Sequence, residues 1–130
     1  MFDRECADLG ALRVIGGLRD EEHVSCASRK RRTVAIQMVV PTTVRVEAGW
    51  NRTSPAWAFP NRLRIADSPL GTASASTAAG IRARTGLSVA DSHIGAVIQS
   101  AHHDQITVVT SDPGDIRLAA GDKIITVVAI

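Results

Sequence analysis

The chain has 130 residues, of which 45% are hydrophobic and 22% are charged, and its formal net charge is +2. This composition is typical of one folded domain and excludes a disordered chain, because disordered segments contain few apolar residues and carry a high net charge. Aromatic residues make up only 3% of the chain, which argues against a protein that binds single strands mainly by stacking bases on aromatic rings.

The beginning of the chain and its cysteines predict the cellular compartment. The first six residues are rich in charge and lack the apolar stretch of a secretion signal. No apolar run approaches the roughly 18 residues that a membrane span needs. Cys6 and Cys26 are too few for a disulfide scaffold. We therefore expect a cytoplasmic protein without membrane contact.

The first clear strand signal is the β-branched run 34–40. Thr42 or Thr43 is expected to cap a helix that continues to residue 50. Prolines interrupt the segment 51–69, and its residues 61–65 are predicted to form a helical turn. This part of the chain therefore predicts a strand, a helix and an irregular connection.

Two longer helices follow. An alanine-rich helix is predicted over 73–85, because Gly86 directly after it is a typical C-terminal cap. The next helix is opened by Ser88 or Asp91 and extends to Ala101, with apolar residues at helical spacing.

The last part of the chain predicts two strands around a short helix. The strand 106–110 ends at a turn cluster, the helix covers 116–120, and 124–130 is a nearly continuous apolar run. Such a run is typical of a strand covered on both faces, as in a parallel sheet. Strands that alternate with helices predict an α/β fold with a mostly parallel sheet and helices on both of its faces.

Acidic residues stand at points where strands end or helices begin. Asp112 follows the strand 106–110, Glu47 lies in the helix after 34–40, Asp91 opens a helix, and Asp8 lies near the N-terminus. Ligands of parallel sheets bind beyond the carboxyl ends of the strands, so the fold could gather these acids at one edge. Clusters of oxygen ligands suit Mg²⁺ or Mn²⁺, which activate water for phosphodiester cleavage. An aspartate after a strand is more often a turn former or a helix cap, whereas Glu47 is explained equally well as a solvated side chain or as a functional acid.

Three segments, 40–50, 89–94 and 108–116, together resemble the PIN-domain ribonucleases of the VapC toxin type. The resemblance covers residues 34–130 in the expected order, and the stretch from Thr110 to Ile116 before the last strand is its most specific part. It implies one PIN-like domain over residues 1–130, with a central parallel sheet between helices and an acidic pocket for Mg²⁺ or Mn²⁺.

The resemblance also implies a function. Members of this family are bacterial toxins that cleave RNA such as tRNA or rRNA, form homodimers and are neutralised by a cognate VapB-type antitoxin. By motif position, the catalytic metal ligands would be Glu47, Asp91, Asp112 and, less clearly, Asp8. Accessory roles would fall to Asp115, Ser111 and Thr110, and His93 beside the pocket is a candidate for substrate contact. Phosphate contacts could come from four arginines whose simpler explanation is solubility: Arg45, Arg52, Arg62 and Arg64.

Residues 1–33 depart from the family pattern, which expects an apolar strand ending in an aspartate and then a small-residue turn and a helix. Asp8 fits the continuation, with Asp3 as the alternative, yet the residues before Asp8 are polar. The helix expected after Asp8 contains Gly16 and Gly17, which weaken helices. A second hypothesis is therefore a non-catalytic PIN-like module that binds antitoxin or RNA. A third, a phosphoacceptor receiver-type domain, lacks the acidic pair it would need near its first strand.

Overall fold

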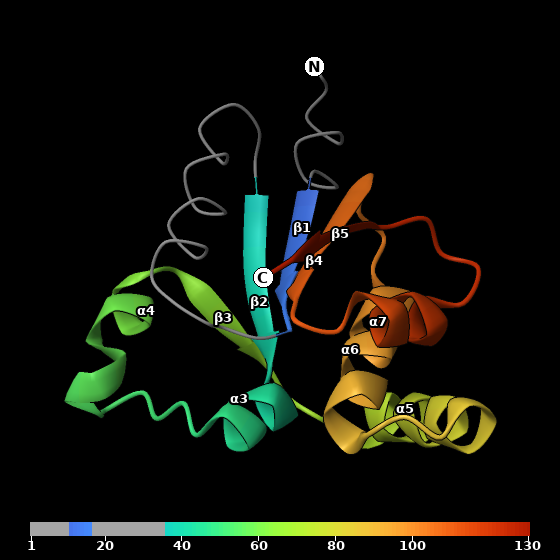
Figure 1. Ribbon diagram of the computed structural model, residues 1–130, viewed down its shortest axis with the longest axis horizontal. Helices are drawn as coiled ribbons and strands as arrows, with labels where there is room; N and C mark the ends of the chain where they lie inside the picture. The colour runs from blue at the N-terminus through green and yellow to red at the C-terminus, as the bar shows by residue number, and fades with distance from the viewer. Residues whose placement is uncertain (1–10, 17–35) are drawn as a thin grey trace.

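The computed structural model describes residues 11–16 and 36–130. Five strands form one sheet in the order β3-β2-β1-β4-β5, and all neighbouring strands run parallel (Figure 1). The strands are β1 (Ala11–Ile15), β2 (Ile36–Pro41), β3 (Ile65–Ser68), β4 (Gln105–Thr110) and β5 (Thr126–Ala129). The helices are α3 (Thr42–Ala48), η2 (Pro55–Trp57), α4 (Ala58–Arg62), α5 (Thr72–Thr85), α6 (Val89–Ser100) and α7 (Pro113–Ala120).

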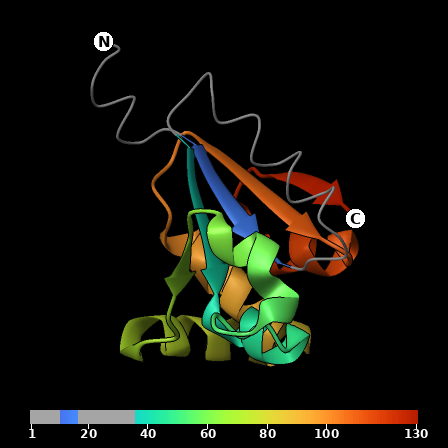
Figure 2. The same ribbon diagram turned by 90° about the vertical axis from the view of Figure 1, so that its left-hand side faces the viewer.

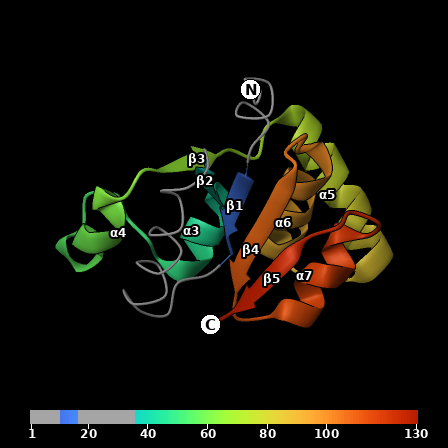
Figure 3. The same cartoon turned by 90° about the horizontal axis from the view of Figure 1, so that it is seen from above.

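The sheet is twisted, as parallel sheets are (Figure 2). Seen from above, α5, α6 and α7 gather around the β4 and β5 half of the molecule, and α3 and α4 lie on the β2 and β3 half (Figure 3). Helix α6 contacts β2, α3, α5 and α7. It is therefore the element that joins the two halves behind the sheet.

The core lies between the central strands and α6. Val14 of β1 is paired with Val39 on one side and Val108 on the other, and both Val14 and Val108 are fully buried. Ile94 and Ile98, one turn apart on α6, are fully buried as well. Burying an aliphatic side chain of this size stabilises a fold by about 1.5–3 kcal/mol, so this layer holds α6 firmly on the sheet.

Local signals explain where the long helices begin and end. Helix α5 ends at Gly86, whose φ of 74° lies in the left-handed region that glycine adopts without strain. Helix α6 begins after Ser88, whose Oγ accepts a hydrogen bond from the Asp91 N–H at 3.1 Å. Ser88 is therefore the cap of this helix, and Asp91 lies in its first turn. No helix in the described ranges is long and apolar enough to cross a membrane.

The beginning of the chain differs from the sequence prediction. The residues from Ala11 to Ile15 form the central strand, whereas a helix was expected after Asp8. Pairing on both sides and burial of Leu12, Val14 and Ile15 outweigh the weak local preference of this segment. Asp8 thus precedes the central strand in the sequence, and the residue that follows β1 is Gly16. Asp8 itself and the alternative Asp3 lie outside the described residues.

Two further predictions in the middle of the chain were wrong. The residues from Ile65 to Ser68 form the edge strand β3, where the helical turn 61–65 was expected to end. The sequence of this strand has no apolar run, and only Ile65 is buried. Its conformation is therefore decided by pairing with β2. Thr42 and Thr43 lie inside α3, and the residue before this helix is the extended Pro41, which makes no side-chain cap.

The C-terminal strand is shorter and more exposed than predicted. Strand β5 lies at the edge of the sheet and pairs only with β4 among the described strands, and Val128 within it is exposed. Ile124, expected inside this strand, precedes it and is 93% exposed. Ile125, Val127 and Ile130 of the apolar run pack against the core, whereas Ile124 and Val128 are exposed, so only one face of this edge strand is buried. Helix α7 begins at Pro113, three residues before the predicted start.

Candidate functional site

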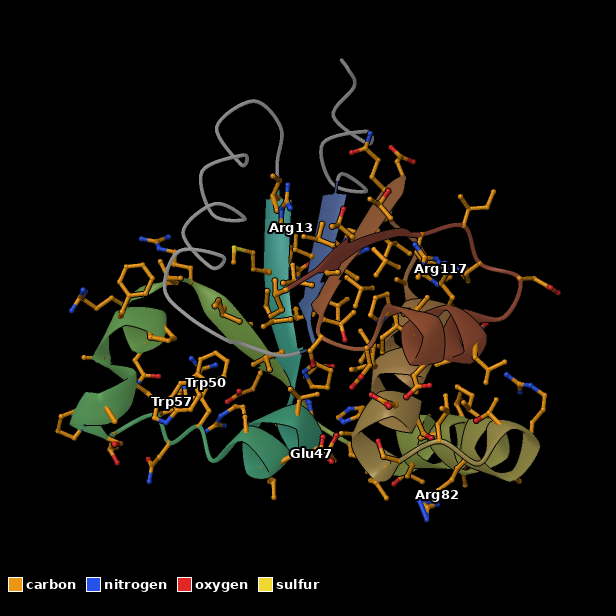
Figure 4. The ribbon with its side chains drawn as sticks, in the orientation of Figure 1. Arg13, Glu47, Trp50, Trp57, Arg82 and Arg117 are labelled. Atoms are coloured by element: carbon orange, nitrogen blue, oxygen red, sulfur yellow. The ribbon has the colours of Figure 1, made fainter. Side chains whose placement is uncertain are left out.

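Four acidic residues stand on segments that meet at the carboxyl ends of the strands. Glu47 lies on α3, directly after β2, and Figure 4 places it where α3 faces α6. Asp112 follows β4, Asp115 lies in the first turn of α7, and Asp91 lies in the first turn of α6. Because all strands are parallel, these segments share one edge of the sheet. Asp8, the fourth acid that was expected at this edge, lies outside the described residues.

The electrostatics of Asp91 show that these acids act on one another. Burial raises the pKa of Asp91 above its usual value, and the negative charges of Asp115, Asp112 and Glu47 raise it further, in that order. The hydroxyl of Ser88 opposes the increase by hydrogen bonding to the carboxylate. Asp91 is partly buried, whereas its three acidic neighbours are exposed. The site is therefore a group of like charges around one partly desolvated carboxylate.

The arginines nearest in sequence to Glu47 do not neutralise this group. Arg45 and Arg52 both pair with Asp67 of β3, at 3.1 and 3.0 Å. Arg52 also donates to the Ile65 carbonyl at 2.6 Å. Among the residues that the structure describes, the ion pairs are these two, and neither involves an acid of the site. Arg45 and Arg52, two of the four arginines that the sequence suggested for RNA contacts, are thus held by partners within the chain.

The aromatic residues near α3 have a structural role. The rings of Trp50 and Trp57 stack with their centroids 5.6 Å apart, and the guanidinium of Arg52 lies 4.7 Å from the Trp50 ring centre (Figure 4). Nε1 of Trp50 donates to Oδ1 of Asn61 at 2.6 Å, and Trp50 is only 3% exposed. This cluster fastens the connection between α3 and β3 and offers no free ring face at Trp50 for a base.

The donor chemistry of the site fits a hard divalent cation, because every acid supplies carboxylate oxygens. In the ranges 11–16 and 36–130, however, no three His, Cys, Asp or Glu side chains converge closely enough to hold an ion. The end of the central strand adds no ligand, since Gly16 has no side chain. A Cβ at Gly16 would lie 3.1 Å from Cδ1 of Ile94 and 3.2 Å from the Val109 carbonyl, so a larger residue would be crowded.

The predicted accessory residues differ in their surroundings. Thr110 is buried, and its Oγ1 accepts a hydrogen bond from the Asp112 N–H at 3.0 Å. This contact fixes the backbone from which the Asp112 side chain projects. Ser111 is exposed, and the structure gives its hydroxyl no hydrogen bond to another described residue.

His93 is fully buried, so the expectation that it touches substrate is wrong. Its Nδ1 lies 2.7 Å from Oγ1 of Thr43 on α3. Burial lowers the pKa of His93, and the Pro69 carbonyl opposes this effect weakly. The other nitrogen, Nε2, is buried and makes no hydrogen bond of ordinary geometry. The sequence contains no signal for the Thr43–His93 contact, because it joins two helices through the fold.

The chain matches no family model, and neither a curated protein nor a solved structure is found to be similar to it.

Proposed function

We propose that the protein is a Mg²⁺- or Mn²⁺-dependent endoribonuclease. The observation that carries this proposal is the partly buried Asp91 at the carboxyl edge of a parallel sheet, whose pKa is raised by burial and, in addition, by the charges of three other acids. Like charges are costly to hold together, and a bound divalent cation would remove that cost. The same edge is where α/β folds bind their ligands.

In this proposal Asp91, Asp112 and Glu47 would hold the cation, and Asp115 would add negative charge. The bound cation would supply an activated water and stabilise negative charge on a phosphodiester. The chain's own residues prepare the site: the side chain of Thr110 fixes the backbone of Asp112, and the side chain of Ser88 fixes the backbone of Asp91. Glu47, Asp112 and Asp115 are exposed, so a ligand as large as folded RNA has access to them.

The resemblance to VapC-type PIN domains extends the proposal. The substrate would be an RNA such as tRNA or rRNA, and the protein would act as a bacterial toxin in the cytoplasm. A cognate VapB-type antitoxin would neutralise it by covering the acidic pocket, and the toxin would form homodimers. Support for this extension comes from the motif residues Glu47, Asp91 and Asp112 and from the all-parallel sheet.

A second candidate is a non-catalytic module of the same fold that binds antitoxin or RNA. The specific observation in its favour is Gly16, which follows the central strand at the point where the family pattern expects an acidic ligand. Crowding by Ile94 and Val109 around Gly16 leaves little space for a side chain there. In this case the remaining acids would form an incomplete metal site.

The test is isothermal titration of the purified chain with Mn²⁺ at neutral pH, together with cleavage of structured RNA. Asp91→Asn removes the central carboxylate, and Asp104→Asn is the matched control, since Asp104 is an exposed acid before β4 at the opposite end of the sheet. We expect Mn²⁺ binding and cleavage in the wild type and in Asp104→Asn, and neither in Asp91→Asn. A folded wild type that binds no Mn²⁺ would refute the metal-dependent activity and favour the non-catalytic module.

A further inference from the structure

Helices α3 and α6 carry two of the acids of the site, Glu47 and Asp91, and a single polar contact joins these helices. Thr43 lies four residues before Glu47 on α3, so the two side chains share one face of the helix, one turn apart. His93 lies two residues after Asp91 on α6. The 2.7 Å contact between Oγ1 of Thr43 and Nδ1 of His93 therefore connects the two short segments that present the acids.

The hydrogen bond between Thr43 and His93 forms with either tautomer of a neutral ring. A neutral imidazole carries one N–H, so Nδ1 either accepts from the Thr43 hydroxyl or donates to it. A hydrogen bond of this kind is strong because water does not compete for a ring that is 0% exposed.

Helix α3 needs such a contact to have a defined position. It has only seven residues, which is too short to be stable without tertiary contacts. Val44 is its one buried residue, and its end from Val46 to Ala48 is exposed. Arg45 fastens the helix toward β3 through Asp67, whereas the Thr43 hydroxyl provides the polar link toward α6 among the described residues.

We propose that Thr43 and His93 are a positioning pair that fixes the distance between Glu47 and Asp91. This inference rests on the proposed function for its purpose, since a fixed distance matters when both carboxylates serve one cation or one substrate. The pair itself touches neither substrate nor cation. His93 is buried and acts as a positioning residue: it holds α3 through its hydrogen bond with Thr43.

The decisive variant is Thr43→Val, which removes the hydroxyl and keeps the branched shape. Thr42→Val is the matched control, because it is the same substitution one residue earlier in the same helix and its hydroxyl has no hydrogen-bond partner in the described part of the chain. Thr43→Ser keeps the hydroxyl and should restore the contact. If Thr43→Val does not fold, Thr43→Ala and Thr42→Ala replace the valine pair, since both threonines are only partly buried.

The first readout needs neither metal nor activity. Glu47→Gln and Asp91→Asn are combined in a double-mutant cycle, and the free energy of unfolding at neutral pH and low salt gives the repulsion between the two carboxylates. We expect this coupling to fall by about twofold or more in the Thr43→Val background. It should be unchanged with Thr42→Val and restored with Thr43→Ser. Equal coupling in the Thr43→Val and Thr42→Val backgrounds would overturn the proposal.

The second readout connects the pair to the site. Loss of a contact that orients a metal ligand typically weakens metal binding by about tenfold or more, so the Mn²⁺ affinity of Thr43→Val should fall by that amount. Thr43→Ser and Thr42→Val should bind Mn²⁺ as the wild type does. A wild type that binds no Mn²⁺ would refute the proposed function alone, because the coupling measurement still decides whether the pair positions Glu47.

Discussion

Gly95 in the middle of α6 allows a sharp test of how this helix is packed. A Cβ built at Gly95 would lie 3.0 Å from the Ala119 carbonyl oxygen, 3.1 Å from the Ala119 Cβ and 2.8 Å from Cδ1 of Ile81. Ile81 ends in a flexible methyl group that can move, whereas the backbone of α7 at Ala119 cannot move without shifting the whole helix. Gly95→Ala should therefore push α6 and α7 apart.

The magnitude follows from two opposing effects. Alanine in a helix interior is more favourable than glycine by about 1 kcal/mol. Insertion of a methyl group into a packed core costs about 1–3 kcal/mol. Because one of the close contacts is with backbone, we expect the upper part of that range and a net loss of about 1–2 kcal/mol. For a chain of this size, the melting temperature should fall by about 4–8 °C.

Gly80→Ala is the matched control. Gly80 lies within α5, is exposed, and has no atom within 4 Å of the point that an added Cβ would occupy. The same substitution there should stabilise the protein by about 1 kcal/mol, since only helix propensity changes. Urea unfolding of both variants measures the two values. If both variants were stabilised equally, α6 and α7 would not approach each other at Gly95, and the position assigned to Asp91 beside Asp115 would be wrong.

Three further predictions concern the site and its supports. Asp91 has a raised pKa, so its contribution to stability is present below its ordinary pKa of 3.8 and is lost as the pH rises through the folded value. In the absence of metal, the melting temperature of Asp91→Asn minus that of the wild type should therefore increase from acidic to neutral pH. A difference that stays constant with pH would contradict the raised pKa of Asp91. Ser88→Ala removes the cap of α6 and should cost about 1 kcal/mol in urea unfolding, whereas a change below a few tenths would show that the cap is not used. Trp50→Phe loses the hydrogen bond to Asn61 and should cost about 1–3 kcal/mol, and Trp57→Phe, which has no such bond between described residues, should cost less.

The parts of the fold that were predictable have local signals. Strand β4 is a β-branched run before a turn cluster, and α5 and α6 have Gly86 and Ser88 at their ends. The strand β1 was missed because its residues are few, include Arg13, and are followed by two glycines. Its conformation depends on pairing with strands far away in the sequence, which a local pattern does not contain. The edge strand β3 was missed for the same reason.

The candidate site was predictable to the extent that its residues follow strands or open helices. Glu47, Asp91 and Asp112 could be grouped because parallel strands end at one edge of the sheet. The charges of Glu47 and Asp112 raise the pKa of Asp91, which agrees with that grouping. The contact between Thr43 and His93 was not predictable, because it depends on the packing of α3 against α6. Asp8 remains a prediction outside the described residues.

The position of β1 between β2 and β4 has a consequence for the synthesis of the protein. Ala11 pairs with Gln105, so the central strand gains its second neighbour only after β4 has been synthesised. Contacts between residues so distant in sequence form slowly, and the N-terminal part of a nascent chain must wait for them. Asp112 and Asp115 follow β4 directly. The acids that surround Asp91 therefore assemble only after α7 has been synthesised, and any activity that depends on them is absent from a nascent chain that ends before it.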